Sequence, residues 1–236
     1  MVKRLLLGVC MLLGIVLHAN AKVYLVSVGL ADYPGTKNDL RISDNDAKTI
    51  AKIFNATKDA DVRTLTNEEA TRSALLSTMQ TSFAEANDND AVILYFSGHG
   101  APGALACYDG LLTYQHIFKK MKACKANRKI ILVDACFSGK MRTTRQQSGS
   151  YTNQNVMLFL SSRTTEKSLE TDFKNSLFTI FLERGLRGGA DVNKDRHITA
   201  RELYDFVHQG VIKASKNRQH PVMWGKFDNN MTIIKW

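Results

Sequence analysis

Short apolar runs alternate with amphipathic segments along most of the chain. Runs rich in β-branched and aromatic residues predict buried strands, and they occupy residues 23–28, 62–65, 91–96, 129–133 and 156–160. Apolar residues at helical spacing predict helices between and after these strands, one from Ser43 and others at 75–83, 114–123, 176–183 and 199–214. The alternation predicts an α/β fold with a mostly parallel sheet and helices on both faces.

Turn and loop signals separate these elements. Thr66 and Glu69 have the spacing of a capping box, which predicts the start of the helix whose apolar stripe begins at Leu75. Glycine and proline after residue 97 predict a loop before the helix at 114–123. Residues 140–155 are polar and have no hydrophobic period, so they predict an exposed loop of 16 residues.

Length and composition favour a single globular domain. The chain has 236 residues, a hydrophobic fraction of 44% and three prolines, which excludes a disordered protein. The net charge of +10 suits anionic surfaces or simple solubility and says nothing about the fold. Basic residues cluster from Lys119 to Lys129 with only Phe118 as an aromatic neighbour, so we expect a solvated helix end and no nucleic-acid partner.

The first 21 residues have the layout of a secretory signal peptide. Lys3 and Arg4 give a positive start, residues 5–17 are apolar, and residues 19–21 form a small-x-small cleavage site. The apolar run is shorter than the roughly 20 residues of a membrane span, so we expect no stable membrane anchor. The mature chain, residues 22–236, is expected to be one periplasmic or secreted domain with a net charge of 30 − 22 = +8.

The mature chain keeps three cysteines, Cys107, Cys124 and Cys136. In an oxidising compartment Cys107 and Cys124 could pair and leave Cys136 as the free thiol. Two small buried hydrophobic side chains are the simpler interpretation of Cys107 and Cys124.

Two predicted strands end in residues with catalytic chemistry. The strand 91–96 leads into Ser97-Gly98-His99-Gly100, and the strand 129–133 leads into Asp134-Ala135-Cys136. Ligands bind at the carboxyl ends of parallel strands. A thiol needs a nearby imidazole to become a thiolate nucleophile and to protonate the leaving amine. A lone His-Gly is usually a loop and a lone cysteine is usually core, but the two strand ends together predict a His99/Cys136 dyad.

The blocks Tyr95-Phe96-Ser97-Gly98-His99-Gly100 and Asp134-Ala135-Cys136 resemble those of the caspase-like cysteine peptidases and, within them, the metacaspase branch. The resemblance implies a caspase-like three-layer sandwich with His99 and Cys136 as the dyad. It also implies an oxyanion hole formed by the N–H groups of Gly100 and Cys136. Asp134 stands where the caspase signature Gln-Ala-Cys-x-Gly has glutamine, which argues against cleavage after aspartate.

Metacaspase-like enzymes cut after Arg or Lys, and the resemblance implies an acidic specificity pocket. Asp46, Asp134, Ser97 and Ser43 match the members of this pocket. Two carboxylates would bind a guanidinium group through charge-assisted hydrogen bonds. Two alternatives stay open, namely Asp46 as an early-helix aspartate stabilised by the helix dipole and Ser43 as a helix N-cap.

The loop at 140–155 contains Lys140, Arg142 and Arg145, each a candidate cleavage site for an enzyme with a basic preference. In relatives, cleavage between the two halves of the domain is an activation step. The resemblance therefore implies a zymogen that processes itself in this loop. A solvated basic loop is the alternative interpretation.

Residues 191–202 match an EF-hand loop at four ligand positions, which are Asp191, Asn193, Asp195 and Glu202. Arg196 replaces the glycine that makes the sharp turn in such loops. We therefore favour an Asp/Asn turn leading into the next helix. Calcium is a weak alternative, and no cofactor is required.

Taken together, these patterns favour an exported cysteine endopeptidase that acts on protein or peptide substrates with Arg or Lys at the cleavage site. A peptide-binding pseudopeptidase and a calcium-controlled interaction module are the alternatives. The sequence leaves the oligomeric state open.

Overall fold

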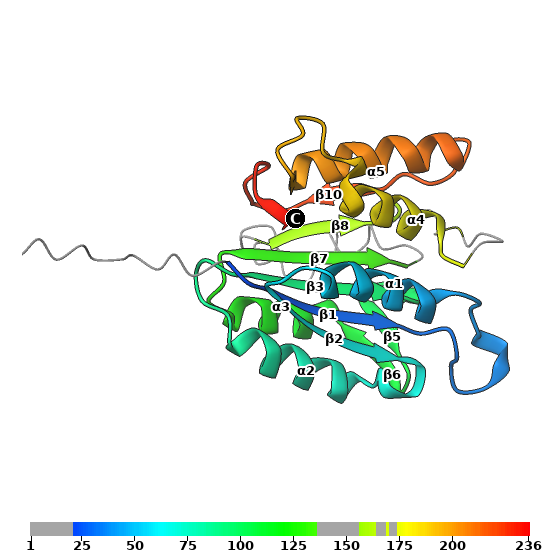
Figure 1. Cartoon of the computed structure of the whole chain (residues 1–236). Coiled ribbons are helices and arrows are strands. Elements are labelled where there is room, and N and C mark those ends of the chain that lie inside the picture. The colour runs from blue at the N-terminus through cyan, green and yellow to red at the C-terminus, as the bar shows by residue number, and fades with distance from the viewer. Residues whose placement is uncertain (1–20, 136–155, 164–168, 170–173) are drawn as a thin grey trace, which may run out of the picture.

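The computed structural model of the chain describes residues 21–135, 156–163, 169 and 174–236 (Figure 1). The predicted signal peptide up to residue 20, Cys136 and the candidate cleavage sites Lys140, Arg142 and Arg145 lie outside the described residues. Within the part of the chain that the structure describes, no helix is long and apolar enough to cross a membrane.

Six strands form the central sheet of the molecule (Figure 1). They are β1 (Val23–Gly29), β2 (Ala60–Thr66), β3 (Ala91–Ser97), β7 (Arg128–Asp134), β8 (Val156–Leu160) and β10 (Val222–Trp224). Their order across the sheet is β10-β8-β7-β3-β1-β2, and every neighbouring pair is parallel except β10 with β8. The predicted mostly parallel sheet is confirmed, and the carboxyl ends of β1, β3 and β7 therefore share one edge.

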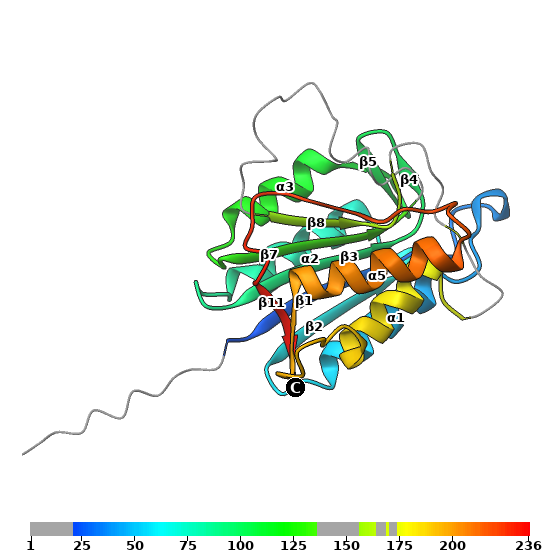
Figure 2. The same cartoon turned by 90° about the horizontal axis from the view of Figure 1, so that it is seen from above.

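Helices cover both faces of this sheet, which gives the three layers seen in Figures 1 and 2. One face carries α1 (Ser43–Asn55), α4 (Leu177–Arg184) and α5 (Ala200–Ala214), and the other carries α2 (Arg72–Ala84) and α3 (Tyr114–Ala123). Each helix buries an apolar stripe. Ile50 and Phe54 of α1 and Leu75 and Met79 of α2 have no exposed surface.

The continuous apolar sequence of the central strands follows from this layering, because successive side chains of a strand point to opposite faces. In β3, Val92 and Leu94 pack in the core under α2 and α3, whereas Ile93 and Tyr95 pack in the core under α1 and α4. All seven residues of β3 are buried. A strand with one face in solvent would instead alternate between apolar and polar residues.

Short antiparallel pairings were the elements that the sequence did not predict. The expected loop after β3 contains a three-stranded sheet of β4 (Gly100–Ala101), β5 (Ala104–Cys107) and β6 (Gly110–Thr113). A second small sheet pairs β9 (His197–Thr199) with β11 (Thr232–Lys235). Strands of two to four residues are too short to show a hydrophobic period, so their pairing depends on tertiary contacts.

The predicted capping box is present, but it starts a short 3-10 helix and not α2. Thr66 and Glu69 bond reciprocally around the short 3-10 helix Asn67–Glu69. The helix α2 begins later, at Arg72, where the Thr71 hydroxyl accepts a hydrogen bond from the N–H of Ala74 at 3.1 Å. The expectation that Thr66 starts the long helix was therefore wrong by five residues, since Thr71 is the N-cap of α2.

The two cysteines of the described core are free thiols. Cys107 and Cys124 are both buried and form no disulfide. Burial raises the pKa of the Cys107 thiol to about 12. Both side chains behave as small hydrophobic groups, which agrees with the simpler interpretation.

Candidate active site

The register of β3 and β7 brings the two chemically active strand ends together. Ser97, the last residue of β3, lies opposite Asp134, the last residue of β7. Beyond this pair, the N–H of Gly98 donates to the Asp134 carbonyl oxygen at 3.1 Å. His99 thus leaves the sheet beside the segment Asp134-Ala135. Cys136 is the next residue of that segment and lies outside the described residues.

The imidazole of His99 is held at one nitrogen. Nε2 lies 2.8 Å from the carbonyl oxygen of Asn38, in the connection between β1 and α1. A carbonyl oxygen can only accept a hydrogen bond, so Nε2 must carry a proton. Nδ1 is then the nitrogen that can take up a proton and return it. The sequence pattern pointed to His99 but contained no signal for Asn38, because a backbone carbonyl can come from any residue type.

Two buried carboxylates lie beneath this edge of the sheet. Asp46 comes from the first turns of α1 and has no exposed surface, and Asp134 is 3% exposed. The Ser97 hydroxyl donates to Asp46 Oδ2 at 2.9 Å. Asp46, Ser97 and Asp134 are therefore brought together as the sequence predicted, from one helix and two strands.

The packing of α1 on β1 makes this convergence geometrically feasible. A Cβ atom at Gly29 would lie 2.7 Å from the Ala47 Cβ, and closer still to the Ser43 carbonyl oxygen. Only glycine allows such an approach. Ser43 is buried as the first residue of α1, and Ile42 occupies the N-cap position without a side-chain bond. The alternative role of Ser43 as an N-cap is therefore wrong.

The start of α4 covers the two carboxylates. Asp46 Oδ1 accepts hydrogen bonds from the Asn175 amide and from the N–H of Ser176, both at 2.9 Å. Asp134 Oδ2 accepts hydrogen bonds from the Ser176 hydroxyl and, at 3.2 Å, from the Thr179 hydroxyl. In this conformation Asp46 does not face solvent directly.

The sequence did not identify the three partners at the start of α4, Asn175, Ser176 and Thr179. The available signal was the Asn-Ser pair before an apolar helix, which is typical of a helix N-terminus. Ser176 is indeed the N-cap of α4, since its side chain accepts a hydrogen bond from the N–H of Thr179. Nothing in the local sequence indicated that the same residues would bond to carboxylates more than 40 positions away.

The environment changes the acidity of Asp46. Burial and then repulsion from Asp134 raise its pKa to about 7, and the hydrogen bonds from Asn175, Ser176 and Ser97 oppose the rise. Two like charges held close in a buried site disfavour ionisation of both. A carboxyl group that titrates near neutral pH is typical of functional sites.

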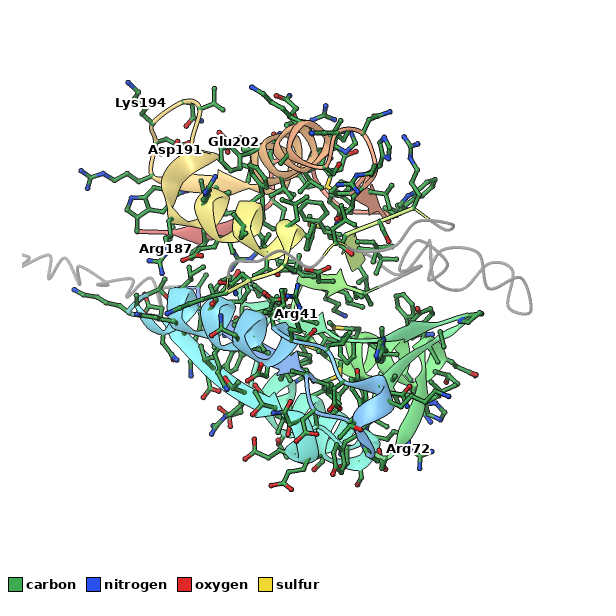
Figure 3. The ribbon with its side chains drawn as sticks, turned by 90° about the vertical axis from the view of Figure 1, so that its right-hand side faces the viewer. Arg41, Arg72, Arg187, Asp191, Lys194 and Glu202 are labelled. Atoms are coloured by element: carbon green, nitrogen blue, oxygen red, sulfur yellow. The ribbon has the colours of Figure 1, made fainter. Side chains whose placement is uncertain are left out.

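The EF-hand-like segment leads into α5, and its last candidate ligand, Glu202, belongs to that helix. Figure 3 shows Asp191, Lys194 and Glu202 on the opposite side of the molecule from Arg72. Asp191 accepts hydrogen bonds from the N–H groups of Asp195 and Arg196 at 3.2 and 3.1 Å. Glu202 accepts from the N–H of Thr199 at 3.0 Å, in a capping box that starts α5.

These oxygens therefore satisfy backbone donors of a turn, as we favoured from the sequence. Asn193 Oδ1 likewise accepts a hydrogen bond from the N–H of Asp195 at 3.0 Å, and Asp195 Oδ1 accepts one from the N–H of His197 at 2.8 Å. Among residues 21–135, 156–163, 169 and 174–236, no group of three or more His, Cys, Asp or Glu side chains is placed to hold a metal ion. Calcium binding at this loop stays an untested alternative.

Comparison with known proteins identifies the family and the fold. Residues 24–231 match the family model of the caspase domain. The chain belongs to the caspase-domain family. In general, members of this family are cysteine peptidases that act on proteins.

Solved structures support the same fold. The match to the crystal structure of caspase-1 from Spodoptera frugiperda covers 91% of this chain and 90% of the caspase-1 chain. Its TM-score is 0.69, and the sequence identity is 15%. The crystal structure of protein GSU0716 from Geobacter sulfurreducens covers 88% of this chain and 95% of its own, with a TM-score of 0.67 and 17% identity. At these identities the likeness concerns the fold alone. No curated protein sequence matches the chain.

Proposed function

We propose that this caspase-domain protein is a cysteine endopeptidase with His99 and Cys136 as its dyad. The observation that carries the proposal is the β3–β7 register, which sets His99 beside the segment that leads directly into Cys136. A histidine and a cysteine from neighbouring strand ends at the carboxyl edge form the arrangement that a thiol nucleophile needs.

The dyad would work by moving one proton. His99 Nδ1 takes the proton of the Cys136 thiol, and the thiolate attacks the peptide carbonyl carbon. His99 then gives that proton to the leaving amine, and water hydrolyses the acyl-enzyme with His99 again as base. The Asn38 carbonyl, 2.8 Å from Nε2, stabilises the imidazolium form. The N–H groups of Gly100 and Cys136 are the proposed donors to the oxyanion.

We propose a metacaspase-like preference for Arg or Lys at the cleavage site, with Asp46 and Asp134 as the acidic pair that selects it. The buried pair is negative once both groups ionise, and Ser97 helps to hold Asp46. Asp46 is bonded to Asn175 and Ser176 in this conformation. A guanidinium group would therefore have to replace those two donors, or contact the pair from the Asp134 side.

Self-processing is part of the proposal. Cleavage after Lys140, Arg142 or Arg145 would separate the strands up to β7 from those after it. The active enzyme would then convert itself to two fragments, whereas the Cys136→Ala variant would stay intact. A wild-type chain that stays intact during prolonged incubation while it cleaves peptides would rule out an activation role for these sites. Export through residues 1–21 belongs to the same proposal.

The experiment that tests the function compares fluorogenic peptides that differ only in ending with Arg, Lys or Asp. The mature chain, residues 22–236, and its Cys136→Ala variant are assayed side by side. We expect Arg or Lys turnover that disappears in the variant. Turnover after Asp would keep the peptidase and exclude the acidic pocket. Peptide binding without turnover in either protein would instead support a pseudopeptidase.

A further inference from the structure

The connection between β1 and α1 surrounds the residue on which the proposed chemistry depends. The hydroxyl of Tyr33 accepts a hydrogen bond from the backbone N–H of His99 at 2.9 Å. The same hydroxyl donates to the Ala106 carbonyl of β5 at 3.2 Å. The rings of Tyr33 and His99 also pack together, with centroids 4.9 Å apart and planes inclined by 43°. Tyr33 thus contacts both the backbone and the ring of His99.

A ring nitrogen of the imidazole is bound by the same connection. Asn38, whose carbonyl lies 2.8 Å from His99 Nε2, is only five positions after Tyr33. The N–H of Tyr33 donates to Asp39 Oδ1 at 3.1 Å, which ties the two parts of the connection to each other. His99 is therefore held at its backbone by Tyr33 and at its ring by Asn38.

This connection is itself held by hydrogen bonds within it and to Asn67, the residue that follows β2. The N–H of Leu40 donates to the Ala31 carbonyl at 2.8 Å, which closes the loop. The Asn67 side chain accepts hydrogen bonds from the N–H groups of Ala31 and Asp32 at 2.9 and 3.1 Å. Asn67 has a φ of 49°, a left-handed conformation that asparagine adopts more readily than most residues. The loop has few ways to move without losing several of these bonds.

The close fit extends to the residue before His99. A Cβ atom at Gly98 would lie 2.7 Å from the Tyr33 hydroxyl oxygen, so a side chain there would displace the phenol. Tyr33 is 6% exposed, and burial raises the pKa of its phenol well above the ordinary value. The hydroxyl stays neutral over the range of enzyme assays and keeps both a donor and an acceptor.

We propose that Tyr33 is a positioning residue for His99, which fixes the imidazole by bonding its backbone N–H and packing against its ring. This inference rests on the proposed function for the importance of His99, but not for the contacts themselves. Removing the hydroxyl would leave the N–H of His99 without its partner and let the imidazole turn away from the proton-transfer geometry.

The test uses Tyr33→Phe, with Tyr114→Phe as a matched control. Tyr114 is 2% exposed, and its hydroxyl also donates to a carbonyl of the small sheet, Ala101 at 3.5 Å, without touching His99. The first readout is the NMR titration of the His99 imidazole, identified by its loss in His99→Ala. We expect Tyr33→Phe to shift or broaden this resonance, and Tyr114→Phe to leave it unchanged.

The second readout is kinetic. In Tyr33→Phe we expect kcat to fall about 10- to 100-fold with KM within about twofold, and the pH dependence of Cys136 alkylation by iodoacetamide to shift. A merely structural role would lower the melting temperature but leave the His99 titration and the alkylation profile as in Tyr114→Phe. That result would overturn the inference.

Failure of the proposed function would look different. If the wild-type chain cleaves no Arg, Lys or Asp peptide, the proposed function fails, but the His99 resonance still decides the role of Tyr33. If Tyr33→Phe does not fold, Asp39→Ala replaces it, because Asp39 is exposed and bonds only the N–H of Tyr33 among these contacts. A smaller shift of the His99 resonance is then expected, and no shift contradicts the inference.

Discussion

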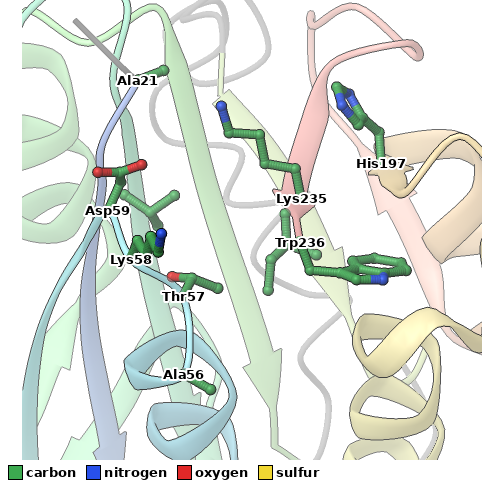
Figure 4. Close-up of a pocket in the computed structure, with 10 residues that line it drawn as sticks. Ala21, Ala56, Thr57, Lys58, Asp59, His197, Lys235 and Trp236 are labelled. Carbon is green, nitrogen blue, oxygen red and sulfur yellow. The ribbon is translucent and has the colours of Figure 1, made fainter.

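The described residues place a cavity at one end of the central sheet and a pair of buried carboxylates at the other. At the amino ends of β1 and β2, a cavity of about 470 Å³ lies between Val23, Thr57 and Trp236 (Figure 4). At the carboxyl ends, Asp46 and Asp134 lie buried under α4. The proposed dyad and the proposed acidic pair lie at the second end. Converging buried charges, rather than a cavity alone, are the feature that points to a functional edge.

Each end of the sheet contains a buried aspartate, and the surroundings of the two aspartates differ. Asp90, just before β3, is 2% exposed, and its two oxygens accept hydrogen bonds from the N–H groups of Lys22 and Asn87 at 2.8 and 2.9 Å. Asp90 is one charge that joins neighbouring chain segments. Asp46 shares its surroundings with a second carboxylate, and this repulsion opposes folding. An arrangement that opposes folding is better explained by a function than by stability.

The largest expected effect separates these two aspartates. Asp46→Asn removes the charge but can keep the bonds, since its amide oxygen can accept from Asn175 and Ser176 while its NH2 group donates to Ser97. We expect kcat/KM for an Arg peptide to fall about 100-fold or more, because a charge-assisted contact to the guanidinium group is lost. Steady-state kinetics with Arg and citrulline peptides measure the loss.

Asp90→Asn is the matched control at the amino end of the sheet. It also removes one buried carboxylate, and we expect Arg turnover within about twofold of wild type because Asp90 is remote from the carboxyl edge. Equal losses in the two variants would mean that the charge of Asp46 acts through stability rather than through recognition of the substrate.

The two ends of β1 should also differ in their tolerance of one extra carbon atom. Gly29→Ala puts a Cβ 2.7 Å from the Ala47 Cβ, so α1 must shift, and overpacking of this kind costs about 1–3 kcal/mol. Val23→Ile adds a methyl group beside the cavity and should cost almost nothing. Denaturant unfolding measures both variants. A neutral Gly29→Ala would contradict the tight packing that positions Asp46.

The sequence predicted the central fold because its elements are long and strongly periodic. The strands β3 and β7 and the helix α3 were placed within a residue of their observed limits. It also predicted that Asp46, Ser97 and Asp134 would share a site, through the family resemblance. The partners of these groups were missed because they are backbone groups or small polar residues, such as Asn38 and Ser176, whose contacts arise only from tertiary packing.

A third prediction uses the pKa of Asp46 to test whether its charge recognises the substrate. With a pKa of about 7, the ionised fraction rises about tenfold between pH 6 and pH 8. The kcat/KM ratio of Arg to citrulline peptides should rise by about the same factor, because citrulline has no charge to recognise. The dyad affects both peptides equally and cancels in the ratio. In Asp46→Asn the ratio should be flat, and a wild-type ratio that does not change with pH would exclude the carboxyl group.

Stability should change with pH in the opposite direction. The folded state holds the Asp46 proton up to about pH 7, whereas the unfolded state releases it near 3.8. Between these values the folded chain binds more protons, so the free energy of unfolding falls as pH rises. Comparing Asp46→Asn with wild type by denaturant unfolding at pH 4 and pH 7 isolates this contribution, which the variant should lack.

The smallest effect is expected at the Asp191 loop, which leads into β9 at the cavity end of the molecule. Asp191→Ala removes the acceptor of two backbone hydrogen bonds, from Asp195 and Arg196, and should lower the free energy of unfolding by about 1 kcal/mol. We expect the same loss in calcium and in EDTA, because the oxygens of this loop already satisfy backbone donors. A melting temperature of the wild-type chain that rises with calcium, and does not rise in Asp191→Ala, would contradict this interpretation. It would show that the loop is a cation site and that the cavity end of the sheet carries a function of its own.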